Sequence, residues 1–137
     1  MPDYAAIQAL AERARARIRE VSPQEAARLR SEGALFIDVR DEEELLRNPP
    51  IAGAVHFSRG QLEYRISDAA SGHDELLVLY CAGGNRGALA SASLQELGYT
   101  RVVNLAGGLM AWNLAHGRPW HHPPGHDADT LPPIGHD

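Results

Sequence analysis

Cysteine and lysine are the scarcest residues in this 137-residue sequence: there is one cysteine, Cys81, and no lysine. A single cysteine excludes a framework of internal disulfides and fits a reducing compartment, so we expect a cytoplasmic protein. All 13 basic residues are arginine. We treat this as a compositional bias and infer no function from it.

Long apolar runs and excess positive charge are also absent. No apolar run approaches the ~18 residues of a membrane-spanning helix, so we expect no membrane insertion. Residues Met1 to Tyr4 lack the basic and then apolar segments of a secretory signal, and none is expected. The net charge of −5 argues against nucleic-acid binding as the main task, because neutralising phosphates requires basic surface.

The residues that are present are typical of one α/β domain. Hydrophobic residues make up 44% of the chain, which is enough for a globular core. Short apolar runs alternate with helical patterns, which predicts three layers: a central parallel sheet of about five strands with helices on both faces. We expect strands at 18–21, 35–39, 54–57, 76–80 and 102–105. We expect helices at 22–33, 41–46, 61–66, 87–97 and 107–115, the first capped by Ser22.

The N-terminal segment differs from this body. Residues 3–17 predict an amphipathic helix with Ile7, Leu10, Ala11 and Ala14 on one face, which we expect to pack against the domain. A helix that mediates dimerisation or partner binding is the alternative, so a monomer and a homodimer both stay open. We therefore divide the chain into a helical extension (1–17), a domain (18–118) and a C-terminal tail (119–137).

The tail is rich in proline, glycine, histidine and aspartate and has little hydrophobic periodicity. This composition predicts a flexible, solvated segment. Its histidines, His121, His122, His126 and His136, leave a metal-binding tail as a second interpretation. Their irregular spacing and the lack of a thiol ligand favour the solvated tail, and we expect no metal site.

The most informative residue is Cys81, which follows the apolar run 76–80. It begins a loop, Ala82-Gly83-Gly84-Asn85-Arg86, that leads into a helical segment. A strand, a glycine loop and a helix start together present backbone N–H groups to an anion. The thiolate is the nucleophilic form of cysteine, and Arg86 adds a permanent positive charge. We therefore interpret Cys81 as a nucleophile rather than as a buried, inert thiol.

Five segments occur in an order and at spacings that are specific only when taken together: Phe36–Arg40 with Glu44, Ile51–His56, Arg59–Glu63, Cys81–Arg86 and Asn104–Trp112. They resemble the signatures of rhodanese-like domains, over roughly residues 18–118. The resemblance implies the rhodanese-like version of the three-layer fold predicted above.

The resemblance also implies a sulfurtransferase. The Cys81 thiolate would take the outer sulfur of a donor such as thiosulfate, form a persulfide and pass the sulfur to cyanide, a small thiol or a protein acceptor. The N–H groups of Ala82 through Gly87 would stabilise the anionic sulfur without a metal or an organic cofactor. Ala82 stands where many thiosulfate-using members carry arginine, so the donor stays open.

Two other functions compete with this one. A rhodanese-like module that carries or senses sulfur, or binds a protein, without turnover would keep the same loop. Phosphatase and arsenate-reductase relatives have a seven-residue loop, whereas Cys81 to Arg86 is a six-residue C-x4-R loop, as in relatives that transfer sulfur.

Charged residues near the expected strand ends are candidate supporting residues. Arg86 either attracts anionic donors or holds the loop by pairing with a carboxylate, for which Glu63 is the better candidate. Arg59 and Glu63 are expected at the rim of the pocket. A second group is expected to form a structural ion-pair network: Asp38, Arg40 and Glu44. Neither His56 nor His73 has a spacing to Cys81 that supports a cysteine–histidine dyad.

Overall fold

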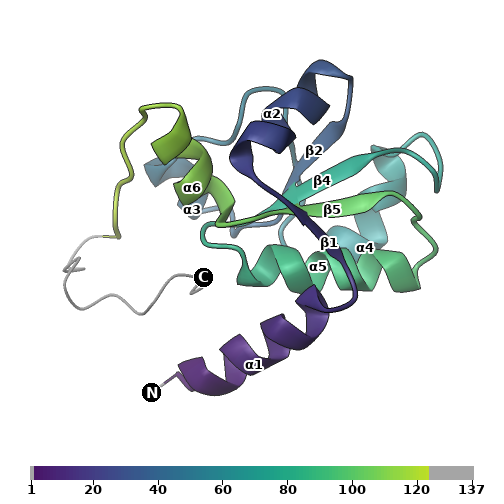
Figure 1. Ribbon diagram of the computed structural model, residues 1–137, viewed down its shortest axis with the longest axis horizontal. Helices are drawn as coiled ribbons and strands as arrows, with labels where there is room; N and C mark the ends of the chain where they lie inside the picture. The colour runs from purple at the N-terminus through teal and green to yellow at the C-terminus, as the bar shows by residue number, and fades with distance from the viewer. Residues whose placement is uncertain (1, 124–137) are drawn as a thin grey trace.

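The computed structural model describes residues 2–123, which fold around a parallel sheet of five strands in the order β1-β5-β4-β2-β3 (Figure 1). The strands are β1 (Arg19–Val21), β2 (Leu35–Asp38), β3 (Val55–His56), β4 (Leu77–Tyr80) and β5 (Val102–Leu105). All neighbouring strands pair in parallel. The predicted three-layer α/β fold with a five-stranded parallel sheet is confirmed.

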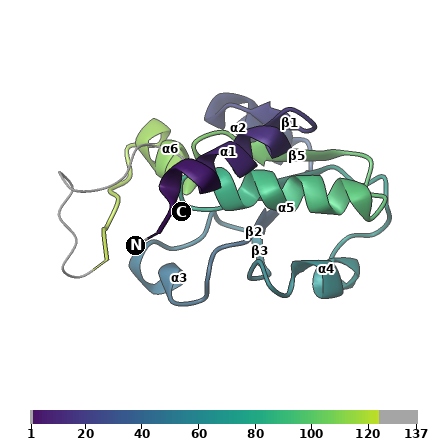
Figure 2. The same ribbon diagram turned by 90° about the horizontal axis from the view of Figure 1, so that it is seen from below.

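Helices cover both faces of the sheet (Figures 1 and 2). On one face lie α2 (Pro23–Ser31) and α6 (Gly108–Ala115), and on the other lie α4 (Leu62–Arg65), the 3-10 turn η1 (Ile66–Asp68) and α5 (Asn85–Glu96). The remaining helices are α1 (Tyr4–Arg15), which packs against α5, and α3 (Glu44–Arg47). No helix among residues 2–123 is long and apolar enough to cross a membrane.

Strand β4 shows how alternation of side chains places the cysteine. Successive side chains of a strand point to opposite faces. Leu77, Leu79 and Cys81 belong to the hydrophobic cluster under α4 and α5, whereas Val78 and Tyr80 belong to the cluster under α2 and α6. Cys81, the first residue after β4, therefore faces the layer that contains α5.

The start of one helix matches the prediction, and the starts of two others differ from it. Ser22 caps α2 as predicted, because its hydroxyl accepts a hydrogen bond from the Glu25 N–H at 3.1 Å. Helix α3 begins at Glu44 rather than Asp41, since the Glu44 carboxylate accepts the Asp41 N–H at 2.9 Å and closes a turn there. Helix α5 begins at Asn85, two residues earlier than expected, so Asn85 and Arg86 form its first turn.

Helix α1 packs against the domain through small residues. Its Ala14 meets Ala88 and Ala92 of α5. The predicted apolar face is only partly buried, however, because Ile7 is 41% and Leu10 46% exposed. The first turns of α1 extend beyond α5 (Figure 1), so the expectation that these two side chains pack against the domain was wrong.

The strand order reverses between β2 and β4, which in open parallel sheets forms a crevice outside the ends of these two strands. The chain leaves β2 towards β3 on one side and leaves β4 towards β5 on the other. In open parallel sheets, ligands bind at such a point, outside the carboxyl ends of the two strands. Cys81 follows β4 and Arg40 follows β2, so the fold brings both connections to this crevice.

The first residues of the predicted tail lie against the domain. The Asn48 side chain donates to the His121 carbonyl at 2.8 Å and accepts the His121 N–H at 2.9 Å. The indole of Trp120 packs against the hydrophobic cluster under α2 and α6. His126 and His136 lie outside the described residues.

Candidate active site

The sulfur of Cys81 lies in a cradle of backbone N–H groups. Its Sγ accepts hydrogen bonds from Gly84 N at 3.0 Å and Gly87 N at 3.2 Å, and the residue is fully buried. Gly87 is the third residue of α5, so its N–H is one of the donors that a helix start leaves unpaired. Burial disfavours a charged sulfur, whereas these donors and the helix dipole favour it.

The loop is held in this form by the start of α6. The N–H of Leu109 donates to the Cys81 carbonyl at 2.8 Å, and the N–H of Met110 donates to the Ala82 carbonyl at 3.0 Å. With these carbonyls held by α6, the amides of the loop are left for the sulfur. This contact requires glycine at position 108, because a Cβ there would lie 2.5 Å from the Ala82 carbonyl oxygen and φ is +62°.

Two further glycines let the cradle close around the sulfur. Gly84 precedes α5 with a φ of +122°, a conformation that favours glycine. A Cβ on Gly87 would lie 2.2 Å from Asn104 Oδ1. Gly84 and Gly87, which both donate to Sγ, are therefore glycines for different reasons, one for its backbone and one for the close approach of a neighbour.

Arg86 pairs with Glu44 across the crevice between β2 and β4. Its Nη1 and Nη2 donate to the two carboxylate oxygens at 2.6 and 2.9 Å. Burial raises the pKa of the Glu44 carboxyl, but the hydrogen bonds and charge of Arg86 outweigh it, and the pKa lies below its usual value. The expectation that Glu63 pairs with Arg86 was wrong, since α4 places Glu63 beside another partner.

The partners of Glu63 are Arg59, which precedes α4, and Ser93, which lies in the second half of α5. Glu63 Oε2 accepts from Arg59 Nη1 and from the Ser93 hydroxyl, both at 2.6 Å. Burial raises the pKa of Glu63, and the bond from Ser93 with the pairing to Arg59 lowers it overall. These contacts join Arg59 and Glu63 to the second half of α5 rather than to the cysteine loop.

Asp38 and Arg40 form a buried ion pair at the end of β2, as expected, whereas Glu44, which was expected in the same network, pairs with Arg86 instead. Arg40 Nη2 donates to Asp38 Oδ2 at 2.8 Å, and both side chains are fully buried. His56 Nε2 lies 2.6 Å from the Arg40 carbonyl oxygen. His73 stacks on Tyr99 with ring centroids 4.5 Å apart. The His56 contact ties β3 to the residues after β2, and the His73 stack joins the segment before β4 to the segment after α5, so both of these histidines have partners other than Cys81.

The sequence did not point to a second group of residues behind the loop. Arg15 of α1 donates from Nη1 to Asn85 Oδ1 at 3.1 Å, and Gln8 accepts from Asn85 Nδ2 at 3.3 Å. Asn104 donates to the Gly84 carbonyl at 3.2 Å and to Glu20 at 2.7 Å. Arg15 and Asn85 are 70 residues apart, and no local pattern signals a contact over such a distance.

The described part of the chain contains no cluster of side chains that could bind a metal ion. No group of three or more histidine, cysteine, aspartate or glutamate side chains among residues 2–123 could hold a metal ion. The site is a single sulfur in an amide cradle, beside an arginine–glutamate pair.

Fold and site together define a parallel α/β domain that holds one cysteine sulfur at the start of a helix. Residues 22–115 match the profile of the Rhodanese-like domain family. The chain belongs to this family.

Named relatives extend this result. The chain is 34% identical over 94 residues to the thiosulfate sulfurtransferase GlpE of Ectopseudomonas mendocina, which covers 69% of this chain and 84% of that protein. It is 35% identical over 89 residues to a sulfurtransferase of Allochromatium vinosum, covering 65% and 79%.

Solved structures show the same fold. A polysulfide-sulfur transferase homodimer from Wolinella succinogenes has a TM-score of 0.69 and 32% identity, covering 89% of this chain and 91% of that one. A Rhodopseudomonas palustris protein, described as of unknown function and a possible tyrosine phosphatase, has a TM-score of 0.72 and 32% identity, covering 84% and 93%.

Proposed function

We propose that this protein is a sulfurtransferase that carries a sulfane sulfur on Cys81 as a persulfide. The observation that carries the proposal is the position of Sγ, 3.0 and 3.2 Å from two backbone N–H groups at the start of α5. Such donors stabilise a negative charge on the inner sulfur, so the sulfur can stay unprotonated. The relatives named as thiosulfate or polysulfide sulfur transferases support the same chemistry.

The proposed reaction has two half-reactions. The Cys81 thiolate attacks the outer sulfur of thiosulfate, a new S–S bond forms, and the old S–S bond breaks with its electron pair leaving on sulfite. An acceptor such as cyanide or a thiolate then attacks the outer sulfur of the persulfide, and the Cys81 thiolate leaves. Each half-reaction returns a stable anion, so no metal, oxidant or reductant is needed, and the kinetics are ping-pong.

Arg86 is proposed to hold the loop rather than to bind the donor directly. Its two hydrogen bonds to Glu44 fix the guanidinium against α3. Because such a two-point pair is geometrically demanding, it sets the position of the first turn of α5, which supplies the Gly87 donor. The other residues of the loop, Ala82, Gly83 and Asn85, are proposed to shape the cradle.

The phosphatase alternative rests on the description of the Rhodopseudomonas palustris protein. The six-residue loop from Cys81 to Arg86 disfavours it, since a tetrahedral phosphate group needs a wider ring of amides than one sulfur atom does. A module that carries sulfur without turnover would show the adduct but no catalysis. A reducing compartment such as the cytoplasm suits all three functions, sulfur transfer, phosphate hydrolysis and sulfur carriage, because it keeps the thiol reduced.

Formation of thiocyanate from thiosulfate and cyanide tests the proposal. Wild-type protein is expected to turn over, and Cys81→Ser is expected to lose the activity while its unfolding curve stays close to that of the wild type. Mercaptopyruvate and polysulfide are tested as alternative donors. Activity retained in Cys81→Ser would overturn the proposal, as would hydrolysis of an aryl phosphate in the absence of any sulfur transfer.

A further inference from the structure

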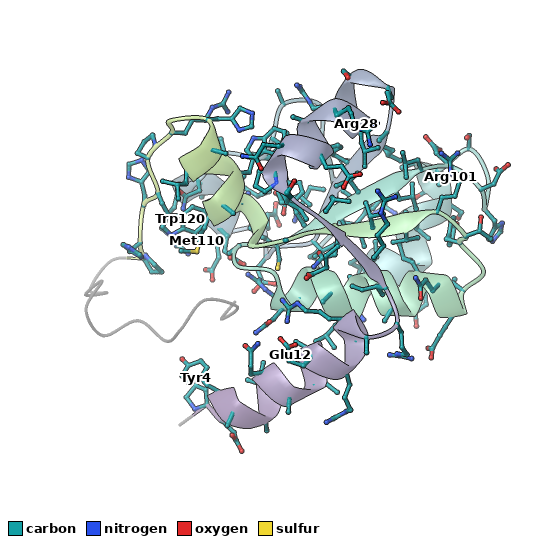
Figure 3. The ribbon with its side chains drawn as sticks, viewed as in Figure 1. Tyr4, Glu12, Arg28, Arg101, Met110 and Trp120 are labelled. Carbon is teal, nitrogen blue, oxygen red and sulfur yellow. The ribbon has the colours of Figure 1, made fainter. Side chains whose placement is uncertain are left out.

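Arg15, near the end of α1, reaches the outer side of the cysteine loop. Its Nη1 donates to Asn85 Oδ1 at 3.1 Å and to Glu12 at 3.1 Å, and its Nε donates to Glu20 at 3.1 Å. The guanidinium also lies against Gly84, because a Cβ on that glycine would be 3.0 Å from Arg15 Nη2. Side chains fill the space between α1, where Glu12 is labelled, and the start of α5 (Figure 3).

A chain of hydrogen bonds leads from Arg15 to the carbonyl of Gly84, and its last member, Asn104, also lies against Gly87. Glu20 Oε2 accepts from Arg15 Nε and from Asn104 Nδ2, the latter at 2.7 Å. Asn104 Nδ2 also donates to the Gly84 carbonyl at 3.2 Å. Asn104 Oδ1 faces the other donor residue, Gly87, whose Cβ position would be 2.2 Å away. One asparagine thus touches the two glycines whose N–H groups bind Sγ.

The burial of this chain separates it from ordinary surface pairing. Asn104 is fully buried, and its Oδ1 has no hydrogen-bond partner among residues 2–123, a costly state for a polar atom. The Arg15 side chain is only 18% exposed, although α1 is an outer helix. By contrast, Arg17, two residues on, pairs with Glu96 at 3.5 Å with both side chains more than half exposed.

We propose that Arg15, acting through Glu20 and Asn104, is a positioning residue that keeps the N–H groups of Gly84 and Gly87 aimed at the Cys81 sulfur. This inference rests on the proposed sulfur chemistry of Cys81. It assigns α1, which lies outside the residues matched to the family, a part in setting the reactivity of the thiolate.

The charged groups around the loop define what a test must control. Arg86 with Glu44 lies at its α3 side, and Arg15 with Glu12 and Glu20 lies at its α1 side. The buried pair Asp38–Arg40 lies at the end of the neighbouring strand β2. Removing Arg15 changes both a charge and a geometry, so a charge-matched variant must separate the two.

The experiment titrates the single thiol in the full-length protein by the ultraviolet absorbance of the thiolate, with Cys81→Ser as the blank. Arg15→Ala is expected to move the titration midpoint to higher pH by about one unit, a tenfold change in the thiol–thiolate equilibrium. Glu20→Gln is expected to move the midpoint in the same direction, although the loss of a negative charge alone would favour the thiolate. Persulfide formation from thiosulfate is expected to slow about tenfold, less than the ~100-fold loss of a whole donor. The double variant is expected to add little to either single change, because the residues act through one chain.

Two further variants complete the test. Arg17→Ala removes the same charge from the same segment and is expected to leave the midpoint unchanged. Arg15→Lys keeps the charge but cannot reproduce the fork of contacts, so it is expected to resemble Arg15→Ala. Unfolding curves establish that each variant is folded at the assay temperature, and Glu20→Gln, which preserves size, stands in should Arg15→Ala not fold.

An Arg15→Ala midpoint equal to that of the wild type would overturn the inference, as would an equal shift in Arg17→Ala or full recovery in Arg15→Lys. These outcomes are distinct from failure of the proposed function. If the wild-type thiol titrates but the protein accepts sulfur from no donor, the proposed sulfur transfer is refuted. The titration midpoints of the variants would still test the role of Arg15.

Discussion

Three glycines at the site differ in what they must accommodate. Gly84 has a positive φ at the start of α5, Gly87 lies against Asn104, and Gly108 combines a φ of +62° with close contact to the backbone of Cys81 and Ala82. Of these three glycines, only Gly108 has both a positive φ and a steric contact within 3 Å to backbone atoms. Backbone atoms cannot move aside as a side chain can. The loop geometry therefore depends most strongly on this one residue of the Gly107-Gly108 pair.

Gly108→Ala is predicted to destabilise the protein by about 3–5 kcal/mol, from the positive φ and the clash together. Gly33→Ala is the matched control, because Gly33 has a φ of +94° but nothing within 4 Å of the Cβ position. Its cost is expected to be about 1–2 kcal/mol. Denaturant unfolding measures both, and equal losses in the two variants would contradict the role given to the α6 contact.

Arg86→Ala is predicted to lower the free energy of unfolding by about 1–3 kcal/mol, since it leaves the half-buried Glu44 carboxylate without its two hydrogen bonds. If Arg86 holds the loop, kcat for thiocyanate formation falls while KM for thiosulfate changes little. Arg86→Lys is expected to recover stability only in part, because one ammonium cannot make both bonds. A raised KM with unchanged stability would instead assign Arg86 to donor binding.

At the scale of elements, the Arg86–Glu44 pair joins α3 to α5, and so joins the connections that follow β2 and β4. Glu44 comes from the first and Arg86 from the second. A backbone hydrogen bond from the Val39 N–H to the Tyr80 carbonyl, at 2.9 Å, joins the two strand ends, and the Arg86–Glu44 pair joins the connections that follow them. The pair therefore couples the position of α3 to the start of α5.

The lowered pKa of Glu44 predicts a pH dependence. A carboxyl whose pKa is lower in the folded protein stabilises it at pH above the usual value of 4.5, and this contribution is lost as the pH falls through the lowered value. Glu44→Gln is therefore expected to be less stable than the wild type at neutral pH, and the difference is expected to narrow below pH 4.5. Glu42→Gln, exposed on the same segment, serves as the control. A gap that is constant at all pH values would contradict the pairing.

The sequence was sufficient for the elements but not for the partners of the charged residues. Strand β5 was predicted with its observed bounds, since buried parallel strands appear as short apolar runs between breakers. The loop, and the presence of a helix after it, followed from the spacing of Cys81 and the glycines, although the helix begins two residues earlier than predicted. The partner of Arg86 did not, because Glu44 lies 42 residues away and only the strand order brings them together.

At the scale of the whole molecule, the contacts between α1 and the domain include an alanine contact and the hydrogen bonds of Gln8 and Arg15. Ala14 meets Ala88 and Ala92, while Ile7 and Leu10 remain about half exposed. Amphipathicity alone predicted that all these side chains would be covered; it could not show that α5 passes beneath only part of α1. Whether the exposed part binds a second copy stays a prediction of the sequence.

Deletion of residues 1–17 is predicted to leave the five-stranded sheet folded, because the family match begins at residue 22. The shortened chain is expected to be less stable, since removing Ala14 uncovers Ala88 and Ala92 on α5. Circular dichroism and denaturant unfolding measure both effects. Light scattering of the two forms would show whether α1 mediates dimerisation, and an unchanged free energy of unfolding would contradict the packing role of α1.

The central claim, that Cys81 carries a sulfur atom between two half-reactions, is tested most directly by intact mass spectrometry of the pure protein. Because the chain has one cysteine, any thiol adduct is assigned without ambiguity. We expect a gain of one sulfur atom after thiosulfate, its removal by cyanide, and no gain in Cys81→Ser. The absence of any adduct with thiosulfate, mercaptopyruvate or polysulfide, or an adduct that persists in Cys81→Ser, would contradict it.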